Sequence, residues 1–157
     1  MSPKLAGLKL TLEALGIRLN TDSLSGRVQL QKAVYLAQAA GVPLRYRYNW
    51  YIRGPYSPAL TRDYFELSRI DAASGYRLSD KSEEAIEVIR PLLTVPPTVG
   101  LLRDRWLELL ASLLYLERES GISKAQAYNV LAQRKPSLRS YAPSAQKQLE
   151  AAGLVGN

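Results

Sequence analysis

The chain has 157 residues, of which 21 are basic and 14 acidic, and its formal charge is +7. It contains no cysteine and no histidine, which excludes disulfides, zinc sites built on thiolate or imidazole, and the commonest general base near neutral pH. The positive charge favours a polyanionic partner or an acidic protein surface, and a basic protein without such a partner is the alternative. We expect no enzymatic activity, no cofactor and no metal.

Apolar runs are only a few residues long, far from the roughly 20 that a membrane-spanning helix needs. The first nineteen residues carry leucines at helical spacing but no continuous apolar stretch of the kind found in signal peptides. We therefore expect a cytoplasmic protein that does not enter the membrane.

The N-terminal part of the chain predicts two helices. Leucines at spacings of three and four indicate a helix from Lys4 to Leu15, ended by Gly16. A polar link follows at residues 20–26, and a second helix is expected from Arg27 to Ala40, ended by Gly41. The buried face of this second helix consists mostly of small residues, so a neighbouring helix can approach closely and the helix is expected to be central.

The sequence pattern changes from helical spacing to alternation between Leu44 and Ile52, where aromatic and basic residues alternate. In an extended chain, one side would hold Tyr46, Tyr48 and Trp50, and the other side Arg45, Arg47, Asn49 and Tyr51. This segment is a short strand, a wing or an extended loop. Because one side must be buried, we expect at least two of the first three aromatic residues inside and Arg45, Arg47 and Tyr51 outside.

A turn at residues 53–56 is followed by a strong helix start. Ser57 is expected as the N-cap and Pro58 as the first helical residue, with the helix running to about Ala73. Asp80 and Glu83 have the spacing of a capping box for the next helix.

Two breaks follow. Pro91 is expected to kink or end the helix that contains it. The segment 94–100, with two prolines and a glycine, is the clearest connector in the chain. We expect one domain, with a possible N-terminal lobe at residues 1–93 and a possible C-terminal lobe at residues 101–157.

The C-terminal part predicts a long helix from Leu101 to Glu119 with a broad apolar face. Ser123 and Gln126 form a second capping box for a short helix, and a last helix is expected at 143–152. This order resembles a helix-turn-helix or winged-helix unit, although three short helices around one core would give the same pattern. A secondary basic surface is expected there, made of Lys124, Arg134, Lys135, Arg139 and Lys147.

The candidate binding site lies in the stretch from Ser23 to Arg62, which contains no Asp or Glu. Arginines neutralise phosphates or carboxylates, and aromatic side chains stack on bases or anchor protein interfaces. The predicted partner- or nucleic-acid-binding residues are Arg45, Arg47, Tyr51, Arg53, Tyr56 and Arg62. The alternative is that half of the aromatic residues are core and the arginines are a solvated face. Asp63 and Glu66 are expected to be solvated or paired with arginines, rather than a metal or acid–base pair.

The stretch LQKAVYLAQAAGVPL, the tyrosine-rich run after it and RGPYSPAL resemble the bacterial YwgA-like family, as does the tail with LLYL, QRKPS and GLV. The resemblance covers residues 27–67 and 106–155. The GPYS turn is also similar to one in the toxin-neutralising C-terminal domain of antitoxins that reverse DNA ADP-ribosylation. A more distant likeness is to the Panacea (SocA-like) antitoxin domain. In one position, Ala33 stands where a larger apolar residue is expected.

The resemblance implies a mainly helical fold and a role in protein neutralisation, adaptor work or regulation, with no catalytic motif to carry over. Our first hypothesis is a non-enzymatic binding or adaptor module of a prokaryotic toxin–antitoxin or phage-defence system, with a toxin or defence component as its protein partner. The alternative is a nucleic-acid-binding regulator or defence-complex subunit, which the charge and the C-terminal helix order favour. The oligomeric state and the identity of the partner stay open.

Overall fold

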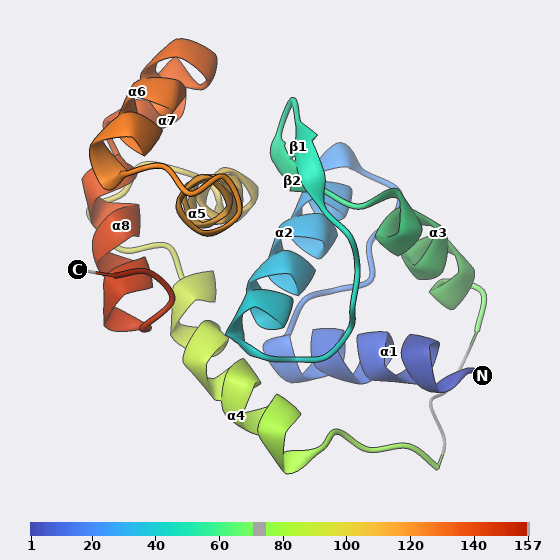
Figure 1. Cartoon of the computed structure of the whole chain (residues 1–157). Coiled ribbons are helices and arrows are strands. Elements are labelled where there is room, and N and C mark those ends of the chain that lie inside the picture. The colour runs from blue at the N-terminus through green and yellow to red at the C-terminus, as the bar shows by residue number, and fades with distance from the viewer. Residues whose placement is uncertain (71–74, 157) are drawn as a thin grey trace.

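The computed structural model describes residues 1–70 and 75–156, and it is mainly helical with one small antiparallel sheet (Figure 1). The mainly α fold with a short extended segment near residues 44–52 is thereby confirmed. In chain order the elements are α1 (Pro3–Leu15), α2 (Leu24–Ala40), β1 (Asn49–Tyr51), β2 (Gly54–Tyr56), α3 (Pro58–Leu67), α4 (Asp80–Ile89), the 3₁₀ helix η1 (Arg90–Leu93), α5 (Arg103–Arg118), α6 (Lys124–Arg134), α7 (Pro136–Arg139) and α8 (Ala142–Ala151).

Helix α2 is central, as its face of small residues predicts. It packs against α1, α4, α5 and β2, and Ala33 and Ala37 are fully buried in these contacts. The helix begins at Leu24 rather than at Arg27, because the Ser23 side chain accepts a hydrogen bond from the Gly26 backbone N–H and caps it earlier.

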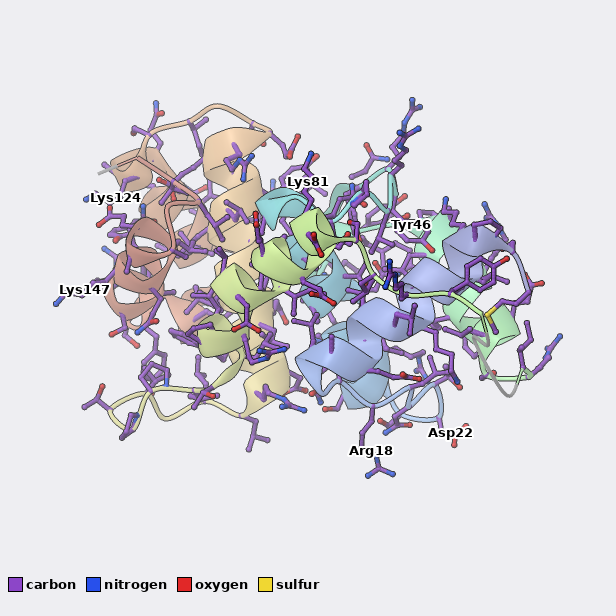
Figure 2. The ribbon with its side chains drawn as sticks, turned by 90° about the horizontal axis from the view of Figure 1, so that it is seen from below. Arg18, Asp22, Tyr46, Lys81, Lys124 and Lys147 are labelled. Carbon is purple, nitrogen blue, oxygen red and sulfur yellow. The ribbon has the colours of Figure 1, made fainter. Side chains whose placement is uncertain are left out.

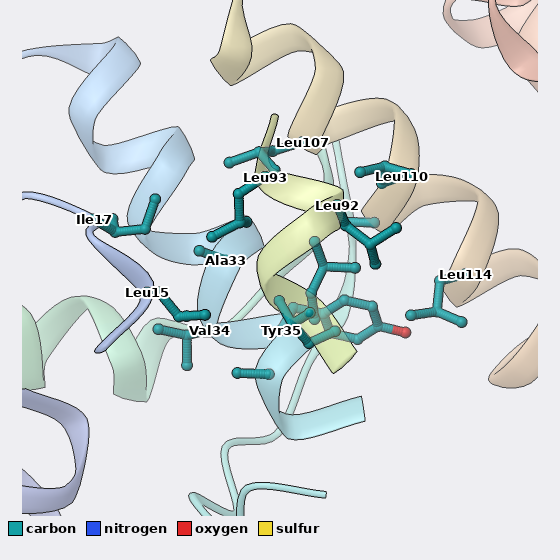
Figure 3. Close-up of a cluster of buried hydrophobic side chains, with 14 of the residues drawn as sticks. Leu15, Ile17, Ala33, Val34, Tyr35, Leu92, Leu93, Leu107, Leu110 and Leu114 are labelled. Carbon is teal, nitrogen blue, oxygen red and sulfur yellow. The ribbon is translucent and has the colours of Figure 1, made fainter. Parts of the chain in front are cut away.

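Helix α5 lies between α2 and the C-terminal helices (Figure 1). Its Trp106 is fully buried and donates its indole N–H to the Leu92 carbonyl at 2.9 Å, which ties α5 to η1. Leu92 and Leu93 of η1 lie with Leu107 of α5 in the cluster drawn in Figure 3. The buried side chains on both sides of the 94–100 connector belong to one continuous hydrophobic cluster.

Strands β1 and β2 form a hairpin that stands over α2 and beside α5 (Figure 1). Asn49 pairs with Tyr56 and Tyr51 with Gly54. Two strands of three residues are not stable alone, so the hairpin depends on the helices beneath it. Gly54 has φ +88°, and a Cβ there would lie 2.5 Å from the Ser112 Oγ of α5, so glycine allows the hairpin to approach α5 closely.

Several predicted boundaries can be compared with the structure. Ser57 caps α3 by accepting from the Leu60 N–H, and Ser123 and Gln126 form the expected capping box of α6. The N-cap of α4 is Ser79, not Asp80, because the Ser79 hydroxyl accepts from the Ser82 N–H. Helix α3 ends at Leu67, short of the predicted end near residue 73, and residues 71–74 lie outside those described.

Between residues 75 and 156, as far as the structure describes them, the chain forms helices and connecting segments without a strand. Pro91 stands in η1, directly after α4 ends, as a helix-ending proline should. Among the described residues, no helix has the length and apolar content that crossing a bilayer requires.

The close approach of the hairpin to α5 yields a stability prediction. Gly54→Ala should destabilise the protein by about 2–4 kcal/mol, because the added methyl group combines an unfavourable positive φ with overpacking against Ser112. Gly121→Ala is the matched control: Gly121 also has a positive φ, +67°, but open space around it, so its cost should stay near 1 kcal/mol. Urea unfolding of both variants measures the difference.

Adding Ser112→Ala to Gly54→Ala should recover part of the loss. The nearest atom to the new methyl group is then the residue-112 Cβ, at an ordinary 3.6 Å. The Ser112 hydroxyl is buried and makes no hydrogen bond within the described structure, so removing it alone should cost little. Equal losses for Gly54→Ala and Gly121→Ala would contradict the proposed packing.

Candidate partner-binding site

Side chains from α2 hold the backbone of the second strand and the start of α3. The Gln31 amide accepts from the Ser57 N–H and donates to the Ser57 carbonyl, both at 2.9 Å. One residue later, the Lys32 Nζ donates to the Pro55 carbonyl at 2.6 Å. These bonds satisfy backbone groups that a three-residue strand cannot pair. The LQK and GPYS stretches, more than twenty residues apart, are thus joined directly.

A second buried lysine holds the tip of the hairpin from the other side. The Lys135 Nζ donates to the Ile52 carbonyl at 2.6 Å and to the Glu108 Oε2 at 2.8 Å, while Arg105 lies 3.6 Å from the other oxygen of Glu108. Lys135 is therefore not part of an exposed basic surface, contrary to the sequence-based expectation. It is buried because the hairpin carbonyl and the α5 carboxylate both lie within its reach.

A cavity of about 370 Å³ opens between α2, the hairpin and α3. We call it the α2–α3 groove. Among the described residues that line it there is no Asp or Glu. The lining residues are Leu24, Arg27, Val28, Gln31, Lys32, Tyr51, Ile52, Arg53, Tyr56, Thr61, Tyr64 and Phe65.

Large apolar side chains gather at the rim of the α2–α3 groove. Within the described structure, eight large hydrophobic side chains are exposed, and four of them line this one groove. They are Leu24, Tyr51, Ile52 and Phe65. Ile52, at the hairpin tip, is 93% exposed. Exposed apolar side chains scattered singly need no explanation, but a group around a cavity is typical of a binding site.

The floor of the α2–α3 groove contains a cation in an unfavourable environment. Lys32 is only 2% exposed, and burial lowers the pKa of its amine to about 7. Among the neighbouring charges, Glu108 has the largest effect and raises the pKa, whereas Lys135 and Arg53 lower it. Because Glu108 already pairs with Lys135 and Arg105, the positive charge of Lys32 has no carboxylate of its own.

A second cavity, which we call the arginine hollow, lies farther along α2. It is lined by Tyr35, Gln38, Ala39, Arg45, Tyr46, Arg47, Tyr48, Arg118 and Glu119. The Gln38 amide bonds both backbone groups of Tyr46 at 2.8 Å, and Arg45 takes a positive φ of +63° beside it. This geometry fixes the backbone between Arg45 and Arg47, and both side chains are exposed.

The aromatic side chains of this segment follow the predicted alternation, but one of the three, rather than at least two, is fully buried. Tyr46 is buried, Tyr48 and Trp50 are half-buried, and Arg45, Arg47 and Tyr51 face outward. The Tyr35 and Tyr48 rings meet edge to face at 4.9 Å. Their hydroxyls are buried and make no hydrogen bond in the described structure, and in Figure 3 the Tyr35 hydroxyl points toward Leu114 of α5.

The structure divides the predicted binding residues between these two places. Tyr51, Arg53 and Tyr56 meet in the α2–α3 groove, where the rings of Tyr51 and Tyr56 contact each other at 5.1 Å. Arg45 and Arg47 lie in the arginine hollow. The sixth residue, Arg62, is exposed on α3 and lines neither cavity.

The expected secondary basic surface is only partly available. Lys124 pairs with Glu150 at 3.6 Å, and the Arg139 guanidinium lies over the Tyr128 ring. Arg134 and Lys147 are exposed, and Figure 2 shows Lys147 pointing away from the C-terminal helices. With Lys135 buried, these side chains do not form one concentrated patch.

Sequence reasoning missed much of the lining of the α2–α3 groove. Arg27 and Lys32 belong to the basic stretch but were not assigned to the site, and Leu24 and Phe65 were not considered. The available signal was the polar pair Gln31–Lys32, which interrupts the apolar face of a central helix and therefore requires buried partners.

Asp63 and Glu66, expected to be solvated or paired with arginines, have different surroundings in the structure. Asp63 accepts a hydrogen bond from the Tyr46 hydroxyl at 2.7 Å, so its partner is a tyrosine rather than an arginine. Glu66 is exposed. Among the described residues, no group of three or more acidic side chains is placed to hold a metal ion.

Comparison with known proteins adds no assignment: no family model, no curated protein and no solved structure matches the chain. The function is therefore argued from the geometry of the two cavities.

The burial of Lys32 predicts a pH dependence of stability. Its pKa is about 7 in the folded protein and about 10.5 in the unfolded chain, so the unfolded chain binds more protons between these values. The free energy of unfolding should therefore rise with pH from 7 towards 9.5, by up to about 1.4 kcal/mol per pH unit. Urea unfolding at pH 7, 8 and 9 measures this slope.

Lys32→Met should flatten that slope, whereas Lys81→Met, at an exposed position, should leave it unchanged. The range stops below pH 10 because burial raises the pKa of Tyr35, Tyr46 and Tyr48, which reverses the sign at higher pH. A wild-type slope that persists in Lys32→Met would show that another group causes it.

Proposed function

We propose that the chain is a non-enzymatic protein-binding module whose α2–α3 groove receives an amphipathic, acidic segment of a partner protein. The observation that carries this proposal is the gathering of Leu24, Tyr51, Ile52 and Phe65 around a groove that contains cations and no carboxylate. The apolar rim offers area to bury, and the charge of the lining complements an acidic segment.

The shape of the site favours a peptide segment over a small substrate. The groove is bounded by two helices and a hairpin, and Ile52 stands almost fully exposed at the hairpin tip. A small molecule inside the groove would leave this side chain in water, whereas a segment crossing the rim would cover it. Apolar grooves between helices commonly take an amphipathic helix in this way.

The resemblance to antitoxin-like families suggests the kind of partner. A toxin or another component of a defence system is the partner that we propose on that resemblance. The role of the chain would be to neutralise that partner or to act as an adaptor for it. The absence of histidine and cysteine from the whole sequence agrees with a binding role.

A peptide-display selection on the immobilised protein tests the proposal. We expect enriched peptides that combine apolar residues with Asp or Glu, and we expect Ile52→Asp to weaken their binding at least tenfold in fluorescence polarisation. The reason is that the substitution places a negative charge in the apolar rim, where it repels the acidic residues of the peptide.

The matched control is Leu102→Asp. Like Ile52, Leu102 is an exposed branched aliphatic side chain, 78% exposed, but it lies outside the groove. This variant should therefore bind like the wild type. The proposal fails if no peptide is selected, or if the two variants lose affinity equally.

The arginine hollow supports nucleic-acid binding as a second candidate function. Arg45, Arg47 and Arg118 line it together with aromatic side chains, and the chain carries a formal charge of +7. Arginines that neutralise phosphates release counterions, which makes the affinity depend steeply on salt.

For this second candidate we expect binding of single- or double-stranded DNA or RNA that weakens at least tenfold between 50 and 200 mM salt. The double variant Arg45→Ala/Arg47→Ala should lose it, while Arg134→Ala, exposed on the C-terminal helices, should not. Gel-shift titrations at the two salt concentrations measure both effects. Absent or salt-independent binding would eliminate the candidate.

A further inference from the structure

We infer that the α2–α3 groove recognises a carboxylate on its partner, bound among Lys32, Arg27 and Arg53, and that Lys32 takes up a proton when this carboxylate arrives. The inference rests on the proposed function and names the chemistry of the ligand at that same groove. It is carried by the arrangement of charges around Lys32.

None of the three cations forms an ion pair with a carboxylate in the described structure, although Glu108 is close enough to Lys32 to raise the pKa of its amine. Arg27 donates to the Thr21 carbonyl at 2.9 Å, and Lys32 donates to the Pro55 carbonyl at 2.6 Å. Arg53 makes no hydrogen bond or ion pair with any described residue. Carbonyl oxygens satisfy the geometry of a donor but carry no net charge, so they neutralise neither the two arginines nor the protonated form of Lys32.

The other charged groups around Lys32 do not supply the missing carboxylate. From α5 come Glu108 and Arg105, and from the end of α6 comes Lys135. Glu108 pairs with both cations, so this trio already carries one positive charge more than negative. Arg53 approaches from the hairpin, and the side chains of Tyr56 and Tyr64 line the groove from the hairpin and α3.

A carboxylate from outside would change this balance. An opposite charge within about 4–6 Å favours the charged form of an amine, so a bound carboxylate raises the pKa of Lys32 from its value of about 7. At pH 7.5 to 8.5 the free protein holds Lys32 largely neutral and the complex holds it protonated. One proton therefore moves from solvent to the Lys32 Nζ on binding, and nothing else is consumed or released.

Two matched probes test the recognition: 4-phenylbutanoate, which joins an aromatic ring to a carboxylate, and its uncharged amide, 4-phenylbutanamide. Both are titrated into the ¹⁵N-labelled full chain and followed by NMR. We expect the carboxylate to shift resonances of residues around the α2–α3 groove and to bind at least tenfold more tightly than the amide. Arg53→Gln should remove this preference, and Arg18→Gln, at an exposed position outside both cavities, should keep it.

The proton uptake is tested by repeating the titration of 4-phenylbutanoate at pH 6, 7, 8 and 9. The probe stays ionised throughout this range, so any change comes from the protein. We expect a constant Kd below pH 6.5 and a Kd that rises towards tenfold per pH unit above pH 7. Lys32→Met should bind more weakly and with no pH dependence. If Lys32→Met does not fold, the wild-type profile and Arg53→Gln still decide the question.

Three outcomes overturn the inference: equal affinity for the two probes, no shift at the groove with either probe, or a Kd that does not change between pH 6 and 9. These results leave the proposed function standing if selected peptides still bind and Ile52→Asp still weakens them. If the peptides also fail, the proposed function falls with the inference.

Discussion

The hairpin at residues 49–56 depends on side chains from helices that lie far away in sequence. Its two strands have three residues each, too few to be stable alone. Lys32 bonds the Pro55 carbonyl, Gln31 bonds Ser57 and Lys135 bonds the Ile52 carbonyl. These bonds have buried donors, so breaking one would leave a polar group unpaired in the interior. The hairpin is thereby fixed against α2 and α5, and the α2–α3 groove exists because it is fixed there.

The same contacts explain why a charged floor and an apolar rim occur together. The chain at Arg53 must turn, and the turn carries Tyr51 and Ile52 outward beside the two helices. Lys32 reaches the Pro55 carbonyl from the buried face of α2, and its amine consequently lies at the floor of the groove. A site of this kind combines area that can be buried with charge that orients the incoming segment.

Local signals predicted the helices well, and long-range pairing explains what they missed. Ser57, Gly41 and the Ser123–Gln126 pair act within a few residues, so their caps could be read from the sequence. The position of Lys135 could not, because its burial depends on Glu108, 27 residues away, and on a hairpin carbonyl 83 residues away. The candidate site was predicted as one surface for the same reason. The sequence shows that the arginines are close in the chain, but not that Arg45 and Arg47 line a different cavity from Arg53.

The fold does not require a lysine at position 32. The Pro55 carbonyl needs a hydrogen-bond donor, and a neutral donor would satisfy it without the cost of burying a charge. Replacing buried charges by apolar groups is often neutral or stabilising, so a cation beside Lys135 and Arg53 works against stability. What the charge adds is attraction for a carboxylate at the bottom of an apolar groove. A residue that is costly for the free protein and favourable in a complex is what a binding site for an acidic partner requires.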